Sequence, residues 1–256
     1  MRIRDSRFWP DLLRKYALAP SIAMCRVPEM ELLSRIQLAH PVLDHCCGDG
    51  YIATQVFGAG IVDSGVDIDQ GALKAASAAY RTIRQADLGK ELPYADESYA
   101  TVYNNSGIEH IADLKTALGE IRRVLKPGGR FYFNVLNRRY FGYWPLSQAT
   151  AQSYRALQPF YHALDEDEWR DNLTQTGLCV VEFADYFDRR VARVLAWLDY
   201  TYSAHYIGRR RSTFVRVTNR LPTALLIGAW RRLIGRYVWD AQPRQGAGFL
   251  CVAEKQ

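Results

Sequence analysis

The chain has 256 residues, of which 48% are apolar, and its 33 lysines and arginines exceed its 27 acidic residues to give a net charge of +6. This length and apolar content can bury the core of one domain, with room for an elaboration. No apolar run is long enough to cross a bilayer and no signal-peptide core follows the first residues, which predicts a cytoplasmic protein. The five cysteines lack a Cys-x-x-Cys spacing, so neither a disulfide framework nor a bound metal is expected.

The first informative element is a short apolar strand that begins at Val42. It runs into the turn Asp44-His45-Cys46-Cys47-Gly48-Asp49-Gly50, and a helix is predicted over 51–57. A parallel strand delivers its carboxyl end to a crevice, where glycines let a ligand approach the backbone without an intervening Cβ. The turn therefore predicts a nucleotide-binding loop.

Strands and helices then alternate along the chain. The predicted elements are strand 60–69, helix 71–80, strand 82–88, strand 99–105, helix 113–125 and strand 130–136. Apolar residues spaced three and four apart give the last helix one buried face, and Pro127 ends it. This order predicts an α/β fold with a doubly wound parallel sheet.

Two ligand classes fit such a turn. The pattern Gly-x-Gly-x-x-Ala at 48–53, with an acid near residue 67, also satisfies the fingerprint of a nicotinamide dinucleotide, so a dehydrogenase is one alternative. Carboxylates at three successive strand ends, Asp44, Asp67 and Asp87, favour a different ligand. Asp44 would repel a pyrophosphate and attract a cationic amino or sulfonium group. Asp67 is placed to accept from ribose hydroxyls, and Asp87 from an adenine amino group.

These residues and their neighbours resemble class I S-adenosylmethionine-dependent methyltransferases of the type 11 and type 25 groups. The family pattern Asp-x-Gly-Cys-Gly-x-Gly appears at 44–50, the acidic end of strand two at 65–67 and the adenine carboxylate at 86–88. Three further motifs match in order, at 92–99, 108–111 and 122–129. The resemblance is strong over residues 40–136.

The resemblance implies a Rossmann-like sheet of about seven strands with an antiparallel seventh strand, and S-adenosyl-L-methionine as the cofactor. The cofactor contacts that it implies are Asp44, Cys46, Gly48, Gly50, Asp67, Ile68, Asp87, Leu88, Asn104, Asn105 and Ser106. Cys46 departs from the family pattern, which has a glycine at this position. Cysteine is small, so one expectation is that the turn keeps its shape. The alternative is an altered backbone or a slightly weaker hold on the cofactor.

The chemistry that the resemblance implies needs few catalytic residues. A sulfonium methyl is already activated, so the enzyme mainly holds a nucleophile in line with it, a positioning effect worth ~7–11 kcal/mol. A hydroxyl acceptor would benefit from a base, and His110 is the candidate because histidine ordinarily titrates near neutral pH. Glu109 is expected to orient the loop or to bind substrate. The alternative is that His110 only fixes the loop or packs near the cofactor.

In related enzymes the amino-terminal segment folds over the cofactor, so residues 1–40 are expected to form a helical lid. Arg26 is then a candidate partner of the methionine carboxylate. The alternative is an ion pair between Arg26 and Glu29 at the surface.

The acceptor is expected to enter near residues 137–145, which follow strand five. The candidate substrate contacts there are Tyr140, Phe141, Tyr143 and Trp144. Residues 104–107 lack the Asn-Pro-Pro-Tyr type of loop that methylates base amines, which disfavours a nucleic-acid substrate. A weaker resemblance to methyltransferases of glycan, glycolipid and natural-product assembly implies an oxygen acceptor on a small or a lipid- or glycan-linked molecule.

The carboxyl-terminal part departs from the minimal family fold. Helix 164–176 and strand 178–183 are predicted before an insertion at 189–245, and strand 248–254 after it. The insertion is predicted to hold helices at 189–207, 211–220 and 222–239 and to contact the acceptor or a partner. Its segment 189–244 has twelve arginines, no lysine and two acids, a local charge of +10.

Three interpretations of this basic segment stay open. It is a helical subdomain that packs on the sheet, a peripheral contact with an anionic membrane, or a contact with RNA. The expected domain organisation is therefore a lid (1–40), a cofactor-binding domain (41–188 and 246–256) and the insertion (189–245). The expected activity is in-line methyl transfer, with an inactive binding protein of the same fold or an NAD-dependent oxidoreductase as alternatives.

Overall fold

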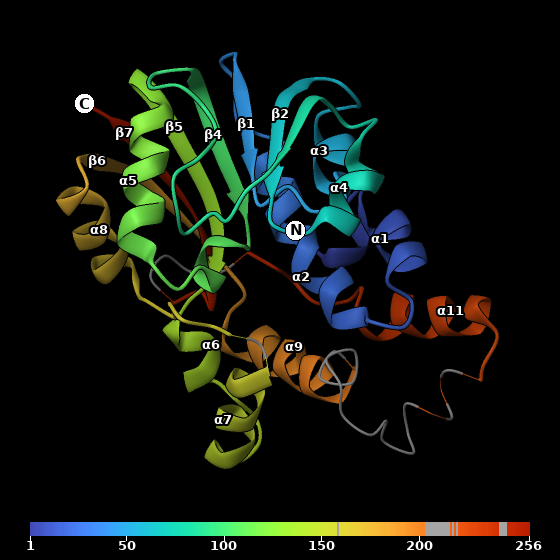
Figure 1. Ribbon diagram of the computed structural model, residues 1–256. Helices are drawn as coiled ribbons and strands as arrows, with labels where there is room; N and C mark the ends of the chain where they lie inside the picture. Colours follow the sequence, from blue (N-terminus) through green and yellow to red (C-terminus); the bar gives the residue numbers. More distant parts are fainter. Residues whose placement is uncertain (158, 203–215, 217, 219, 241–244) are drawn as a thin grey trace. The chain divides into compact units, whose positions relative to one another are not determined.

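The computed structural model describes residues 1–256 except 158, 203–215, 217, 219 and 241–244 (Figure 1). The chain divides into two compact units. The first unit comprises 1–31, 138–160 and 185–248, and the second comprises 32–137, 161–184 and 249–256. Residues of the expected lid and of the expected insertion thus belong to one unit, together with 138–160.

A seven-stranded sheet is the framework of the fold, with the strand order β3-β2-β1-β4-β5-β7-β6. Its strands are β1 (Val42–His45), β2 (Val62–Asp67), β3 (Tyr80–Gln85), β4 (Tyr99–Asn105), β5 (Leu125–Leu136), β6 (Leu178–Tyr186) and β7 (Gly248–Lys255). The first five strands pair in parallel and β7 is antiparallel. This confirms the expected doubly wound, Rossmann-like sheet with helices inserted between strands six and seven.

The parallel register brings the carboxyl ends of neighbouring strands to one edge of the sheet. Asp44 of β1 lies opposite Gly65 of β2 on one side and Tyr103 of β4 on the other. Asn105, the last residue of β4, lies opposite Asn134 of β5. Ligands of doubly wound sheets bind at such an edge.

Helices α5 (Leu114–Val124) and α8 (Glu166–Gln175) pack their apolar faces into the main core. The side chain of Asp113 accepts the Thr116 N–H and starts α5, as an N-cap should. The start of α8 is fixed by a reciprocal capping box between Asp165 and Glu168. Their buried partners on the sheet include Leu43, Val102, Phe131, Phe133, Val135, Phe249 and Cys251.

Two short helices follow β1 and β2, namely α3 (Tyr51–Val56) and α4 (Gln70–Ala76). The side chain of Asp69 caps α4 by accepting the N–H groups of Gly71 and Ala72. The predicted helix over 71–80 was too long. It ends at Ala76 because Tyr80 begins β3, where its side chain is buried.

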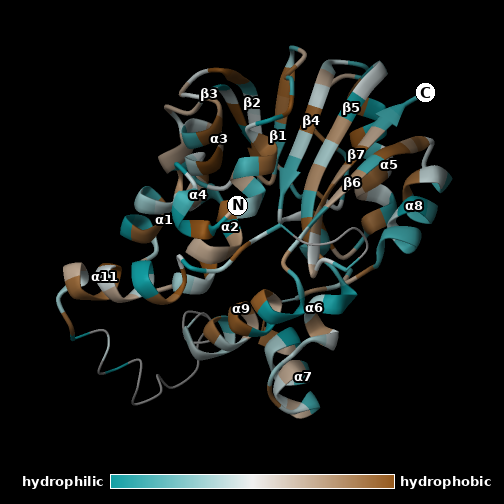
Figure 2. Ribbon diagram, turned by 180° about the vertical axis from the view of Figure 1, so that it is seen from behind, coloured by the Kyte–Doolittle hydropathy of each residue, from teal (hydrophilic) through white to brown (hydrophobic). Residues whose placement is uncertain are grey.

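The first unit is helical. It holds η1 (Ile3–Asp5), α1 (Trp9–Lys15), most of α2 (Pro20–Leu33), α6 (Arg138–Gly142), α7 (Gln148–Leu157), α9 (Arg189–Tyr202) and α11 (Thr223–Leu233). Figure 2 shows both hydrophobic and hydrophilic residues along α9 and α11, and each of these helices buries one face. The indole of Trp230 in α11 donates a hydrogen bond to the carbonyl of Ala17 (3.0 Å).

Some predicted boundaries were wrong in the first unit. The helix predicted over 222–239 ends at Leu233, because residues 235–239 instead pair with the first residues of the chain. Ile3 donates its N–H to Tyr237 and Arg4 to Gly235. The helix predicted over 189–207 is helical to Tyr202, and most of the predicted helix 211–220 lies outside the described residues.

Two further differences concern residues 125–145. Strand β5 begins at Leu125, five residues earlier than predicted, with a shift of its register against β4 between Tyr99 and Thr101. The expected acceptor loop contains the short helix α6.

In the described part of the chain, none of the helices combines the length and apolar content needed to cross a membrane.

Candidate cofactor site

The turn after β1 is held in shape by backbone hydrogen bonds to the neighbouring strand. The N–H groups of Cys46 and Cys47 both donate to the carbonyl of Val66 in β2, at 3.0 Å each. The N–H of Gly50 donates to the carbonyl of Cys47 and closes the turn before α3. The turn is thus fixed at both of its ends.

The two glycines of the turn serve different purposes. Both have left-handed backbones, with φ of 52° at Gly48 and 72° at Gly50. A Cβ at Gly50 would lie 2.5 Å from the Cβ of Ala79, so glycine is needed there for packing. A Cβ at Gly48 would have no atom within 4 Å. Gly48 therefore presents bare backbone to open space, as a ligand-binding turn requires.

Cys46 also has a left-handed backbone, with φ of 69°. A glycine adopts this conformation freely, whereas a residue with a Cβ is strained. The backbone at Cys46 therefore keeps the left-handed conformation that favours glycine, although the residue is a cysteine. The Cys46 thiol accepts a hydrogen bond from the Asn104 amide (3.1 Å), and burial raises its pKa, so it is a neutral thiol.

Gly107 makes room for this cysteine. A Cβ at Gly107 would lie 2.6 Å from the Cβ of Cys46 and 2.7 Å from its sulfur. Only a residue without a side chain can occupy position 107 beside Cys46 in this conformation. The sequence alone did not reveal this pairing, because the two residues lie on different strand ends.

Asp67, at the end of β2, faces the turn with its carboxylate. One oxygen accepts the N–H of Gly48 (2.8 Å) and the other the N–H of Asp69 (2.9 Å). Each carboxylate oxygen has two acceptor positions, so further donors can still bind. The structure thus places Asp67 beside Gly48 at the strand edge, where the sequence predicted it.

Asp44, which was expected to contact a cationic group of the ligand, is almost fully buried. It is 3% exposed, and one of its oxygens accepts hydrogen bonds from the hydroxyls of Tyr80 and Tyr103, at 2.6 Å each. Burial raises the pKa of Asp44 to about 7, although the two tyrosine hydrogen bonds lower it. The observed contacts of Asp44 join β1 to β3 and β4, and its contact with the cofactor stays a prediction.

His45 is a buried member of the site that sequence reasoning missed. Its Nδ1 accepts a hydrogen bond from the Asn104 amide (2.9 Å), and burial lowers its pKa to about 4, so the ring is neutral. Its Nε2 has no hydrogen-bond partner among the described residues. The alternation of side chains along β1 could have indicated its burial, because Leu43 and His45 point to the same face.

Asn104 fastens two loops to each other with its side chain. Its oxygen accepts the N–H groups of Gly107 and Ile108, and its nitrogen donates to His45 and Cys46. The residue is fully buried. Because its amide is used in these contacts, the structure supports a positioning role for Asn104, and a direct contact with the cofactor stays a prediction.

Asn105 and Ser106 follow at the end of β4. The Asn105 oxygen accepts a hydrogen bond from the Asn134 amide (3.0 Å), and the Ser106 N–H donates to the Asn134 carbonyl (2.9 Å). Ser106 has a left-handed backbone with φ of 54°. Asn134 of β5 thereby fixes this strand end, a role that the sequence did not indicate.

The residues expected near the adenine lie in a loop after β3. Asp87 was expected to end the strand, but β3 ends at Gln85 and Asp87 forms a turn by accepting the Gly89 N–H. This hydrogen bond and Lys90 hold the pKa of Asp87 below its usual value. Leu88 points its side chain into the core, whereas Ile68 is 59% exposed.

His110 and Glu109 lie together on the short helix η2 (Ile108–His110), directly after the segment that Asn104 fastens. Glu109 is buried, and its carbonyl accepts the N–H groups of Tyr161 and His162. His110 is half-buried. The structure therefore brings both residues to the carboxyl end of β4, and their catalytic roles stay predictions.

The remaining predicted site residues belong to the first unit. Arg26 forms an ion pair with Glu29, which was the alternative to a contact with the methionine carboxylate. The pair was expected at the surface, but the Glu29 side chain is fully buried. The candidate substrate contacts Tyr140, Phe141 and Trp144 are buried in an aromatic cluster, and Tyr143 is half-buried. The Tyr140 hydroxyl donates to Asp199 (3.1 Å).

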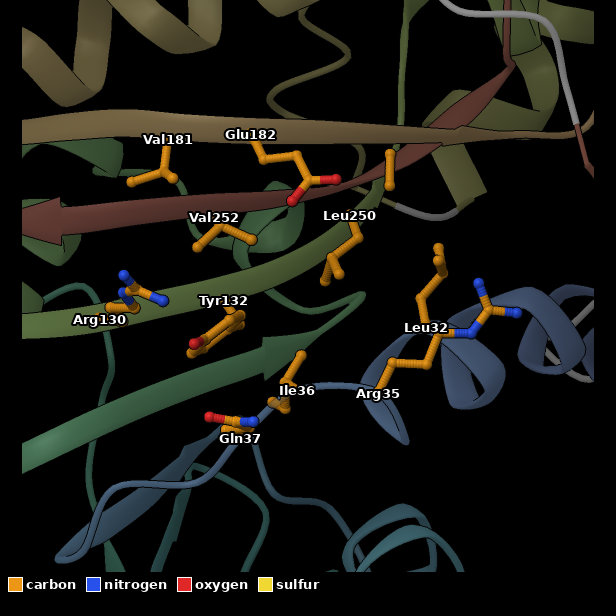
Figure 3. A pocket seen from close by; sticks show the side chains of 11 residues that line it. Leu32, Arg35, Ile36, Gln37, Arg130, Tyr132, Val181, Glu182, Leu250 and Val252 are labelled. Atoms are coloured by element: carbon orange, nitrogen blue, oxygen red, sulfur yellow. The ribbon is translucent and has the colours of Figure 1, made fainter.

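A separate cavity of about 390 Å³ lies against β5, β6 and β7. Figure 3 shows its walls, which include Tyr132, Leu250 and Val252 from the strands and Ile36 and Gln37 from the segment after α2. None of the residues expected to bind the cofactor or the acceptor lines it. Within the described ranges no cluster of His, Cys, Asp or Glu is suited to hold a metal ion.

The strand-end turn meets the requirements of the expected cofactor. Bare backbone at Gly48 opens to space, and the Asp67 carboxylate stands beside it with acceptor positions to spare. Both features suit a ligand with ribose hydroxyls and a charged amino acid end, as S-adenosylmethionine has.

Comparison with known proteins agrees with this geometry. Residues 43–133 match a family model described as a methyltransferase domain. The O-methyltransferase resE of Aspergillus sclerotiorum is 30% identical over 57% of this chain and 58% of its own length. The O-methyltransferase rstn1 of Aspergillus nomiae is 27% identical over 71% of this chain and 82% of its own length.

Other relatives match more narrowly. The ubiquinone biosynthesis O-methyltransferase of Thiobacillus denitrificans is 32% identical over 38% of this chain and 44% of its own length. The chain thus spans about half the length of the first curated relatives that it matches. A solved S-adenosylmethionine-dependent methyltransferase from Thermotoga maritima superposes with a TM-score of 0.61, covering 98% of this chain and 97% of that one at 14% identity. The last likeness is one of fold.

Proposed function

We propose, on the premise that this chain carries a class I S-adenosylmethionine-dependent methyltransferase domain, that it transfers the cofactor's methyl group to an oxygen atom of a small-molecule acceptor. The observation that carries the proposal is the strand-end turn. There the open backbone of Gly48 lies hydrogen-bonded to the carboxylate of Asp67.

Each part of the site has a task in this proposal. The backbone of the turn would lie against the amino acid part of the cofactor, and Asp67 would accept hydrogen bonds from its ribose hydroxyls. When bound, the cofactor supplies a methyl group on a cationic sulfur, so the acceptor oxygen needs mainly to be held in line with it. The new O–C bond forms as the C–S bond breaks.

His110 would take the proton that the acceptor hydroxyl gives up. It stands on η2, whose position depends on the hydrogen bonds from Gly107 and Ile108 to Asn104. The names of the relatives, O-methyltransferases among them, support an oxygen acceptor over a nitrogen acceptor.

Cofactor binding is tested first, by calorimetry with S-adenosylhomocysteine on the whole chain. Asp67→Ala should weaken binding at least about tenfold, because hydrogen bonds to a charged group are worth ~1.5–3 kcal/mol. The matched control is Asp63→Ala, which changes the same residue type at the opposite end of β2. It should leave affinity unchanged. Absence of S-adenosylhomocysteine binding together with tight NAD binding would refute the proposal in favour of an oxidoreductase.

Methyl transfer is tested next with a radiolabelled methyl donor. Panels of phenols, sugar hydroxyls and primary amines should be compared at equal concentration. Methylation among the hydroxyl compounds supports the proposal, and methylation confined to amines contradicts it. Within the hydroxyl class we propose lipid-linked or glycan-linked molecules as the finer choice, which a matched pair of free and polyprenyl-linked sugars would distinguish.

A second function, that of a binding protein without activity, is favoured by one observation. Cys46 brings strain to the turn that the family builds with glycine. Binding of S-adenosylhomocysteine without methyl transfer to any hydroxyl or amine in the panels would select this function. Turnover with any one of them excludes it.

A further inference from the structure

We infer that the first unit has a surface, formed by the outer side of α11 and the first residues of the chain, that binds an anionic lipid membrane. The inference goes beyond methyl transfer and does not depend on it. It rests on exposed leucines and arginines that the fold brings together from segments far apart in the sequence.

Helix α11 has apolar residues on both of its sides. Leu226 and Trp230 are buried, and the indole of Trp230 is fixed by its hydrogen bond to Ala17. Leu225, which is 62% exposed, lies away from this buried side, on the outer side of the helix. Leu233, which ends the helix two turns after Leu226, is 50% exposed. A helix that only covers a core would carry polar residues on that outer side.

Arginines share this outer side. Ala229 and Arg232 lie four and seven residues after Leu225, a spacing that puts all three on one side of a helix, and all are exposed. Arg231 and Arg236 are exposed as well. Leucine and arginine together on one exposed face are typical of helices that lie in the headgroup region of a membrane.

The fold adds arginines from the start of the chain. Arg2 forms an isolated antiparallel bridge with Val238, which is 47% exposed, and Arg4 donates its N–H to Gly235. A Cβ at Gly235 would lie 2.9 Å from that of Arg4, which shows how closely the two segments pack. Both arginine side chains are exposed.

The start of α9 contributes a further arginine. The guanidinium groups of Arg190 and Arg236 lie 5.8 Å and 5.3 Å from the centroid of the Tyr237 ring. We call the combined surface the α11 surface. Its described members are Arg2, Arg4, Arg190, Leu225, Ala229, Arg231, Arg232, Leu233, Arg236 and Val238.

The acids near this surface leave it positive. Among the described residues, Asp5 lies 3.7 Å from Arg4, Asp188 accepts the N–H of Val191 at the start of α9, and Asp240 follows Trp239. These three carboxylates are fewer than the six arginines of the α11 surface. The surface therefore attracts an anionic partner, and each arginine near a charged bilayer adds to that attraction.

The leucines decide which anionic partner fits best. A nucleic acid would satisfy the arginines through its phosphates but would leave Leu225 and Leu233 in water. A bilayer offers phosphate groups and, directly beneath them, an apolar layer for the leucines. RNA is therefore an outcome of the test and not the proposal.

The test uses the full chain in a flotation assay with two kinds of vesicle, phosphatidylcholine alone and phosphatidylcholine with phosphatidylglycerol. The protein should float with the anionic vesicles only, and less so in high salt, because salt screens exposed charges. Arg232→Glu with Arg236→Glu should lower the partition coefficient at least about tenfold. Leu225→Ser with Leu233→Ser should also weaken binding, at unchanged charge.

The matched control is Lys74→Glu with Lys115→Glu, an equal change of net charge at exposed positions of α4 and α5. It should bind vesicles like the parent chain. An equal loss of binding in this control, or no binding of the parent chain, would overturn the inference. The inference would also be overturned if the parent chain bound single-stranded RNA but no vesicles, and if the arginine variant lost this RNA binding while the leucine variant kept it.

S-Adenosylhomocysteine affinity and thermal unfolding should be measured on every variant. Both are expected to be unchanged, since all of the substituted side chains are exposed. Vesicle binding without cofactor binding would refute the proposed activity and leave the membrane inference standing. Cofactor binding without vesicle binding would refute the membrane inference and leave the proposed activity standing.

Discussion

The thiol of Cys46 occupies the space that a side chain at Gly107 would need. The two residues lie at the ends of β1 and β4, and a Cβ added to Gly107 would meet the Cys46 sulfur at 2.7 Å. The cysteine in the turn and the glycine after β4 are therefore complementary. A change in one residue alters what the other position tolerates.

This relationship predicts the result of a double-mutant cycle. Gly107→Ala should destabilise the fold by ~1–3 kcal/mol, because overpacking forces the turn to move. Cys46→Gly relieves the left-handed strain, and the combination of both changes should recover most of the loss. Urea unfolding of the four proteins measures the coupling. Strictly additive effects would contradict the steric explanation.

Asn104 is predicted to act on cofactor binding through the turn. Asn104→Ala leaves the N–H groups of Gly107 and Ile108 without their acceptor, at a cost of ~1–3 kcal/mol for a buried group. Unfolding should occur at lower urea concentration, and S-adenosylhomocysteine should bind several-fold more weakly. Asn172→Ala is the control, since it removes an amide hydrogen bond to the Glu168 carbonyl in α8. A similar loss of affinity in this control would show that general destabilisation is the cause.

The neighbours Asp44 and His45 should give stability opposite dependences on pH. The folded pKa of Asp44 is raised to about 7, so the folded state binds its proton more tightly and this residue lowers stability as pH rises from about 4 to 7. The folded pKa of His45 is lowered to about 4, so protonation favours the unfolded chain and stability rises with pH up to about 6.5.

Single substitutions separate these two contributions. Relative to the parent chain, Asp44→Asn should make the unfolding free energy rise more steeply with pH between 4.5 and 6.5. His45→Gln should have the opposite effect, and each slope changes by up to about 1.4 kcal/mol per pH unit. Urea titrations at several pH values give the slopes. Slopes that match the parent in both variants would rule out buried, shifted groups at these positions.

His110→Gln is predicted to lower kcat and to leave cofactor affinity unchanged. A general base typically contributes about 10²–10⁴-fold to rate, so the loss of kcat should fall in this range. Single-turnover methyl transfer and calorimetry measure the two properties. An unchanged rate would assign His110 to the loop alone, the alternative that the sequence left open.

The sequence was sufficient to predict the framework of this site. Alternating apolar segments predict the sheet because they reflect local periodicity and burial, and glycines at 48 and 50 mark backbone conformations that few residues adopt. Asp67 could be predicted for a similar reason, since a polar residue directly after a buried strand must reach the sheet edge. Boundaries were less certain, as with Asp87, where a local turn competes with the strand.

Contacts between distant segments could not be predicted in the same way. The bonds of Asn104 to His45 and Cys46, and the fit of Cys46 to Gly107, depend on how β1 and β4 align. Asp44 shows the same limit. Its position in a binding motif predicts a ligand contact but does not indicate the two tyrosines that bury its carboxylate, because they approach from other strands.

The pairing of residues 1–4 with 235–239 bears on how the chain reaches its folded state. Trp230 and Ala17 are 213 residues apart in sequence, and the first unit is assembled from three separate segments. During synthesis, strands β1 to β5 have all of their parallel partners once residue 136 has left the ribosome. The first unit cannot be completed until residue 248 is made. For most of translation its amino-terminal segment therefore lacks the segments against which it packs in the folded protein, while the parallel strands can already form.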